Sequence, residues 1–268
     1  MENLKGKVAV VFAASGGIAG AVARSFAEHG AKVYVTARNL DAVKALAKEI
    51  KADGGSAEAA KVDALNETEI DNFFQKIVKD NGKLDIVFNG IGHYYQDAGS
   101  GSPSTTITLE QFLSPLEKFC GSQFLTSRTA AKYMIQTGSE GTILLLTSAL
   151  SRMKTPRMAA FAAASAAMEA LTRVLAAEFG GQGIKVTCIC PSAILESPKM
   201  SEMIGDFAKN MGVSKEQFTE QIYQRFDILK AAPTLKNVGE LAAFLASDNG
   251  ISFNSHIIDV DCGKLNII

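Results

Sequence analysis

The sequence predicts an α/β fold: a doubly wound parallel sheet of about seven strands with helices on both faces. Three observations lead to this prediction. Short apolar runs typical of strands alternate along the whole chain with longer amphipathic stretches typical of helices. Right-handed crossovers between parallel strands would then place these helices on both faces of the sheet. No Pro/Ser-rich linker divides the 268 residues, so we expect residues 1–268 to form a single domain.

The individual elements follow from the period of the apolar residues. Apolar runs predict strands at residues 7–13, 32–37, 57–62, 84–89, 142–147, 184–190 and 257–260. Helical periodicity predicts helices at residues 17–29, 40–53, 67–81, 118–137, 157–180 and 238–247. Ligands of such sheets bind outside the carboxyl ends of the strands, so we expect the functional site there.

Two longer segments interrupt the alternation. Residues 93–115 follow the fourth expected strand and are rich in Gly, Ser, Thr and Pro. Residues 192–233 follow the sixth and begin near two prolines, with amphipathic pieces beyond. Long excursions from strand ends are usually functional loops. We therefore expect residues 192–233 to act as a lid over a small-molecule substrate.

Composition excludes several classes of function. The formal net charge is −1 and both signs are interspersed, which gives no footprint for nucleic acid or a membrane surface. The first apolar run is too short for a signal peptide or a membrane span. The four cysteines and three histidines show no metal-ligand spacing. We expect the cysteines to be reduced thiols in the core of a cytoplasmic protein.

The first strand runs into a turn of small residues and then a helix, the pattern of a phosphate site. Ser15, Gly17 and Ile18 lie where a phosphate would meet bare backbone amides at a helix N-terminus. A plain strand–helix turn without ligand is the alternative.

This turn resembles the Thr-Gly-x-x-x-Gly-x-Gly segment of the short-chain dehydrogenase/reductase family, which implies a Rossmann-type sheet. Gly17 keeps a motif glycine, whereas Ala13 and Ala19 stand at the other two and Phe12 at the threonine. A Cβ at each alanine could crowd a pyrophosphate or restrict the backbone.

The resemblance extends over nearly the whole chain and implies further cofactor contacts. Asn89 and Gly90 fall in the segment similar to the family's Asn-Asn-Ala-Gly, with Gly90 for the second Asn. Asp63 matches an acidic position that contacts adenine in relatives. Pro191 and Ile194 match the Pro-Gly-x-Ile turn on the nicotinamide side.

Two further positions bear on the choice of cofactor. Arg38 follows an alanine where NAD-binding relatives carry an acid, so NADP(H) is expected; an Arg that is only solvated is the alternative. Glu196 falls about where relatives contact cofactor through a hydroxyl, and an acid suits a diphosphate poorly.

The family's catalytic groups are a Ser, a Tyr, a Lys four residues after it, and an upstream Asn. Ser148 matches the Ser, but Phe161, Ser165 and Phe119 stand at the Tyr, Lys and Asn positions. A phenyl ring has no proton to give, and losing a positioned acid costs about 10²–10⁴ in rate. Ser148 itself could have a purely structural role.

Other polar residues could substitute for the missing groups. His93, Tyr94 and Tyr95 follow the fourth expected strand and could donate a proton, or they could simply pack at the surface. Arg152 and the two basic residues after it, Lys154 and Arg157, could meet an anionic ligand or remain solvated.

Three functions remain open at this point. The chain could be an NADP(H)-linked oxidoreductase of a small carbonyl or alcohol, a non-catalytic binding or scaffold protein, or an enzyme of non-redox chemistry in the same cleft. A homotetramer or homodimer is expected because residues 157–180 carry an alanine-rich face. Its members are Ala159, Ala160, Ala163, Ala166, Ala167 and Ala170.

Overall fold

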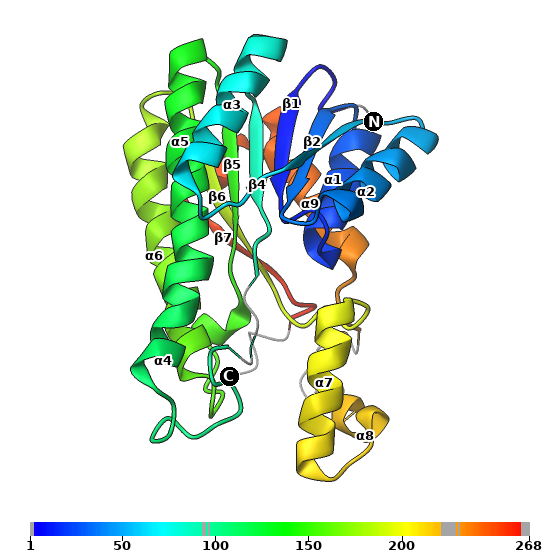
Figure 1. Ribbon diagram of the computed structural model, residues 1–268, viewed down its shortest axis with the longest axis vertical. Coiled ribbons are helices and arrows are strands. Elements are labelled where there is room, and N and C mark those ends of the chain that lie inside the picture. The colour runs from blue at the N-terminus through cyan, green and yellow to red at the C-terminus, as the bar shows by residue number, and fades with distance from the viewer. Residues whose placement is uncertain (1–2, 93–94, 96, 221–228, 230, 264–268) are drawn as a thin grey trace.

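The computed structural model describes residues 3–92, 95, 97–220, 229 and 231–263. Its centre is a seven-stranded sheet in the order β3-β2-β1-β4-β5-β6-β7, and every neighbouring pair is parallel. The strands are β1 (Val8–Phe12), β2 (Lys32–Ala37), β3 (Ser56–Lys61), β4 (Ile86–Asn89), β5 (Thr142–Leu146), β6 (Lys185–Pro191) and β7 (Ile257–Val260). The predicted doubly wound α/β sheet is confirmed (Figure 1).

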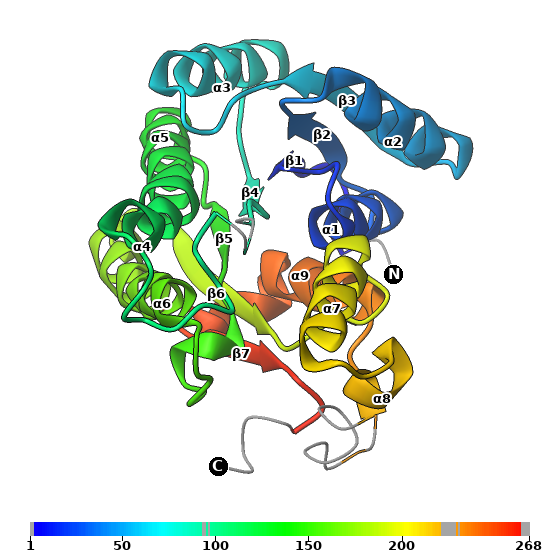
Figure 2. The same ribbon diagram turned by 60° about the horizontal axis from the view of Figure 1, so that its bottom comes forward.

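Helices cover both faces of the sheet. One face carries α1 (Gly17–Glu28), α2 (Leu40–Ala52) and α9 (Leu235–Ala246), and the other carries α3 (Glu67–Asn81), α5 (Gly121–Thr137) and α6 (Ala159–Gly180) (Figures 1 and 2). Because both faces are covered, the central strands are apolar throughout, and all five residues of β1 are buried.

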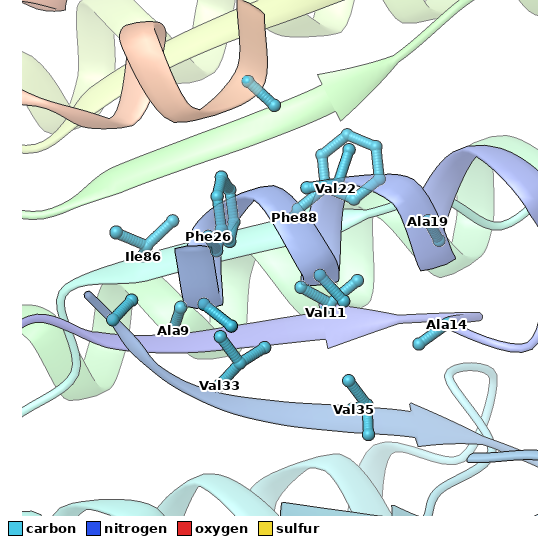
Figure 3. Packing of buried hydrophobic residues seen from close by; sticks show 14 of the residues in the cluster. Ala9, Val11, Ala14, Ala19, Val22, Phe26, Val33, Val35, Ile86 and Phe88 are labelled. Carbon is cyan, nitrogen blue, oxygen red and sulfur yellow. The ribbon is translucent and has the colours of Figure 1, made fainter. Parts of the chain in front are cut away.

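The packing of α1 against β1 and β4 positions the candidate site. Val22 and Phe26, four residues apart on α1, point toward Val11 of β1 and Phe88 of β4, as Figure 3 shows. All four side chains are essentially inaccessible to solvent. This contact fixes the N-terminus of α1 at the carboxyl ends of β1 and β4, where the chain order of the sheet reverses.

The two excursions contain helices that the sequence analysis did not resolve. Helix α4 (Leu109–Pro115) lies inside the segment expected as a loop, and a capping box between Thr108 and Gln111 starts it. The Thr-x-x-Gln spacing in the sequence is the signature of such a helix start. The later excursion forms α7 (Pro198–Met211) and α8 (Lys215–Thr219), which share a small apolar cluster containing Ile204 and Phe218.

Helix α6 is longer and more apolar than its neighbours. Among the described residues it is the one helix that could cross a membrane by length and composition, a test that core helices also pass. Its alanine face divides in the structure: Ala160 is buried, whereas Ala166 and Ala170 are exposed. The outer stripe therefore remains a surface that allows close approach of another helix.

Candidate active site

The turn after β1 presents free backbone amides. Gly16 is the N-cap of α1, no side chain caps the helix, and its first turn contains no acid. The N-terminus of α1 therefore keeps its positive dipole end and unpaired N–H groups for an anion. Ser15 is exposed beside it, and Gly17 and Ile18 are partly exposed.

Ala13 keeps the backbone of a glycine. Its φ is +56°, in the left-handed region that residues other than glycine rarely adopt. Its carbonyl oxygen accepts a hydrogen bond of 2.9 Å from the Gly16 amide, which closes the turn. The alanine side chain has thus not abolished the turn, but the turn carries local strain.

The second alanine of the motif, Ala19, fits because Gly90, directly after β4, has no side chain. A Cβ at Gly90 would lie 2.6 Å from the Ala19 Cβ and 2.8 Å from a ring carbon of Phe88. Real Cβ atoms do not approach so closely, so Ala19 and a side chain at position 90 exclude each other. The close approach between α1 and the end of β4 therefore depends on Gly90.

The side chains of Arg38, Asp63 and Asn89, expected to contact the cofactor, differ in exposure and in hydrogen bonding. Arg38 is exposed immediately after β2. Asp63 Oδ1 accepts a hydrogen bond of 3.0 Å from the Leu65 amide, so part of that carboxylate is used by its own turn. Asn89 is buried and donates to the Thr126 hydroxyl at 2.8 Å, which fixes β4 to α5.

The turn after β6, which the resemblance places on the nicotinamide side, is anchored by contacts with β7 and α9. Pro191 ends β6, and the Ser192 amide donates to the Val260 carbonyl oxygen of β7 at 3.0 Å. Ile194 is buried in the core. Glu196 Oε1 accepts a hydrogen bond of 2.5 Å from the Leu235 amide at the start of α9. Its charge therefore faces a helix N-terminus, where it is favourable.

The positions expected to carry catalysis form an apolar pair and two serines. The rings of Phe119 and Phe161 lie with their centroids 6.4 Å apart at an interplanar angle of 37°. Ser148 is the N-cap of a 3₁₀ turn, Ala149–Ser151, and its Oγ accepts a hydrogen bond of 3.2 Å from the Leu150 amide. The Ser165 hydroxyl is completely buried and has no hydrogen-bond partner in the described structure.

A π-helical turn, Leu116–Cys120, precedes α5 and carries Phe119. Such bulges are frequent at functional sites. The Cys120 thiol lies 3.4 Å from the Ala164 carbonyl oxygen of α6, and burial raises the pKa of Cys120 to about 11. Burial likewise raises the pKa of Cys190 to about 12, so neither thiol is an activated nucleophile.

The chain is similar to known proteins over nearly its whole length. A family profile described as Enoyl-(Acyl carrier protein) reductase matches residues 12–264. A short-chain type dehydrogenase/reductase of Picea abies is 30% identical over 270 residues, covering 98% of this chain and 93% of the relative. The chain belongs to the short-chain dehydrogenase/reductase family, a family of oxidoreductases.

Two further relatives illustrate the range of that family. The (+)-cis,trans-nepetalactol synthase of Nepeta racemosa is 28% identical over 268 residues, covering 98% of this chain and 93% of the relative. A putative NAD(P)-dependent gluconate 5-dehydrogenase of Beutenbergia cavernae, solved with bound NADP, superposes with a TM-score of 0.85. It is 28% identical, and the match covers 99% of each chain. NADP is therefore bound by this structural relative.

Tyr95 is the one candidate substitute for the missing acid that the structure describes. His93 and Tyr94 lie outside the described residues. The Tyr95 hydroxyl hydrogen-bonds the Asp206 carboxylate of α7, and its ring packs on Phe207 with centroids 6.2 Å apart. Burial, followed by Asp206, raises the pKa of Tyr95 to about 12, so this phenol is a weak acid that ties the β4 loop to α7.

Two of the three basic residues after Ser148, Arg152 and Arg157, contact groups within the chain. Arg152 is engaged by the carboxylates of Asp259 and Glu169. The Arg157 side chain donates to the Gly101 carbonyl oxygen at 3.4 Å. Sequence reasoning missed the partners of Arg152 because Asp259 is 107 residues away and no local motif announces the contact.

Proposed function

We propose that the protein binds NADP(H) and reduces a carbon–carbon double bond conjugated to a carbonyl group, rather than an isolated ketone. The residues present fit the cofactor: the uncapped N-terminus of α1 suits a diphosphate, and exposed Arg38 suits a 2′-phosphate. The relative solved with NADP supports the same cofactor class.

The observation that carries the proposal is the phenyl ring of Phe161 at the expected place of the acid, packed against Phe119 at the expected place of the Asn. Reduction of an isolated ketone leaves a charge localised on one oxygen, which needs a positioned proton donor. Reduction of a conjugated double bond leaves an enolate, whose charge is spread over an oxygen and a carbon. A site with a phenyl ring at the place of the acid therefore suits the second reaction better. The description of the matching family profile, an enoyl reductase, points the same way.

NADPH, when bound, would supply a hydride for the β-carbon of the substrate; the C=C electron pair would then join the α-carbon to the carbonyl carbon as a double bond, and the carbonyl π pair would move to the oxygen. Ser148 is the hydroxyl that can hydrogen-bond this oxygen, because its Oγ accepts from Leu150 and its own proton remains available. Phe161, which is partly exposed and packs on the buried ring of Phe119, contributes an apolar wall that favours an unsaturated substrate. Since this wall has no acidic proton, the α-carbon takes its proton from water.

The test compares two substrates that differ only by the double bond. NADPH oxidation is followed with 2-cyclohexenone and with cyclohexanone, and we expect kcat/KM to be higher for the enone by about 10² or more. In deuterated water the saturated product should carry deuterium on its α-carbon. The matched variant Ser148→Ala should lose most of the turnover while still binding NADPH. Comparable rates with both ketones would refute the proposal.

A non-redox reaction in the same cleft is the second candidate. It is favoured by the similarity to a nepetalactol synthase and by the apolar ring pair. Consumption of the unsaturated substrate without NADPH oxidation would select it. Saturable NADPH binding with no consumption of any substrate would instead select a non-catalytic binding protein.

We also propose a cytoplasmic homotetramer or homodimer, in which α6 packs against a second copy. The outer stripe of α6 supports this, because Ala166 and Ala170 are exposed beside Val174, whose exposed fraction is 60%. Small side chains allow two helices to approach closely. Light scattering at micromolar concentration tests the assembly, and a monomeric mass would refute it.

A further inference from the structure

The turn that carries Ser148 is connected by side chains to the neighbouring helix. The Ser151 hydroxyl lies 3.2 Å from the Ser148 carbonyl oxygen and also contacts the Glu169 carboxylate of α6, so its one proton is shared between two acceptors. Arg152 Nε lies 3.4 Å from the same Glu169 oxygen. With a side chain only 15% exposed, Glu169 depends on these partners to compensate its charge.

The other end of this connection lies on β7. Arg152 Nη1 donates to Asp259 Oδ2 at 2.9 Å, and Nη2 hydrogen-bonds the second carboxylate oxygen. Nη2 also lies 3.2 Å from the Cys190 sulfur at the end of β6. A guanidinium held at both donors by one carboxylate has a defined orientation. The carbonyl oxygen of the next residue of β7, Val260, accepts a hydrogen bond from the Ser192 amide, so β7 anchors both the turn after β5 and the turn after β6.

Loss of Arg152 would leave two carboxylates, Glu169 and Asp259, without their shared counter-charge. The half-buried Glu169 would then turn toward solvent or recruit the Ser151 proton entirely. Either change alters the contact between Ser151 and the Ser148 carbonyl oxygen. The 3₁₀ turn is only three residues long, and its backbone hydrogen bonds of 3.1 and 3.2 Å lie at the long end of the usual range, so side-chain contacts add to its support.

We propose that Arg152 is a positioning residue that holds Ser148 in its catalytic orientation through Glu169 and Ser151. The proposal rests on the proposed role of Ser148 in binding the substrate oxygen. With no Tyr, Lys or Asn at the expected positions to orient the substrate, the placement of this single hydroxyl carries more of the catalysis.

The first measurement needs no activity. Hydrogen exchange of the peptide containing residues 149–153 is compared in the full-length protein and in Arg152→Met, and we expect exchange to accelerate roughly tenfold. The control is Arg24→Met, which removes another two-point guanidinium–carboxylate pair, Arg24 with Glu49, at 2.7 and 2.9 Å. It should leave this peptide unchanged. Unchanged exchange in Arg152→Met overturns the proposal whatever the reaction proves to be.

The second measurement uses turnover of the enone. Arg152→Met should lower kcat by up to about 10²-fold with little change in KM, and Arg152→Lys should recover part of it. In a Ser148→Ala background the same replacement should have almost no further effect, because both changes remove one interaction. Additive losses would show a merely structural role and refute positioning. Faster exchange in a parent protein without enone turnover would refute the proposed function but leave the structural coupling intact.

Discussion

Replacing Ala13 by glycine tests whether the phosphate turn keeps its glycine-like backbone. Ala13 has a φ of +56° and is half-buried, whereas its neighbour Ala14 is almost fully buried and has no positive φ. The two alanines therefore form a matched pair on one turn. The same chemical change should affect stability in opposite directions at these two positions.

The magnitude follows from three contributions. Relief of the left-handed backbone at Ala13 is worth about 1–2 kcal/mol. Against it stand about 0.4–1 kcal/mol from the greater freedom of glycine in the unfolded chain and about 0.4 kcal/mol for a half-buried methyl group. The balance is a stabilisation of about 0.5 kcal/mol. Ala14→Gly gains no relief and loses a buried methyl, so it should destabilise by about 1.5 kcal/mol.

The assay is urea unfolding of both variants and the parent at one protein concentration. The free energies of unfolding of Ala13→Gly and Ala14→Gly should differ by about 2 kcal/mol, a gap well above the error of the method. NADPH affinity of Ala13→Gly should be unchanged or higher, because the amides of the turn keep their places. If Ala13→Gly loses as much stability as Ala14→Gly, the backbone at position 13 is not left-handed and the reasoning fails.

Gly90→Ala should destabilise by about 1–3 kcal/mol in the same urea assay, because its Cβ would meet Ala19, and Ala19→Gly should restore part of the loss. Arg38→Ala should weaken NADPH binding about tenfold and NADH binding little, as measured by nicotinamide fluorescence titration. Phe161→Tyr with Ser165→Lys should introduce reduction of isolated ketones, followed as NADPH oxidation. Neither change alone should suffice, since a tyrosine without the lysine keeps a pKa near ~10.

A specific result would contradict each of these predictions. Gly92→Ala, at a position with no atom within 4 Å of the new Cβ, should be nearly neutral, and an equal loss would remove the packing argument for Gly90. Equal weakening of both nucleotides in Arg38→Ala would show that Arg38 does not bind the 2′-phosphate. Ketone turnover by the unmodified protein would show that its proton-transfer machinery is not disabled.

Local sequence patterns were sufficient for the architecture, and the location of the site remains a prediction. The expected strands agree with the observed ones to within two residues, because an alternation of buried apolar runs and amphipathic stretches is a property of short segments. The phosphate turn and Ser148 could be placed from motif spacing and resemblance. The roles assigned to Ser148, Phe161 and Ser165 remain predictions that the proposed variants test.

The sequence by itself determined that this chain builds a parallel α/β sheet with a helix N-terminus at its switch point and a phenylalanine where the resemblance expects an acid. Only the tertiary structure decided how the unusual residues are accommodated. Ala19 is possible because Gly90 lies against it, and Arg152 orients a turn because Asp259 is brought beside it. These contacts join residues 71 and 107 positions apart, and only the packing of crossovers onto the sheet sets such distances.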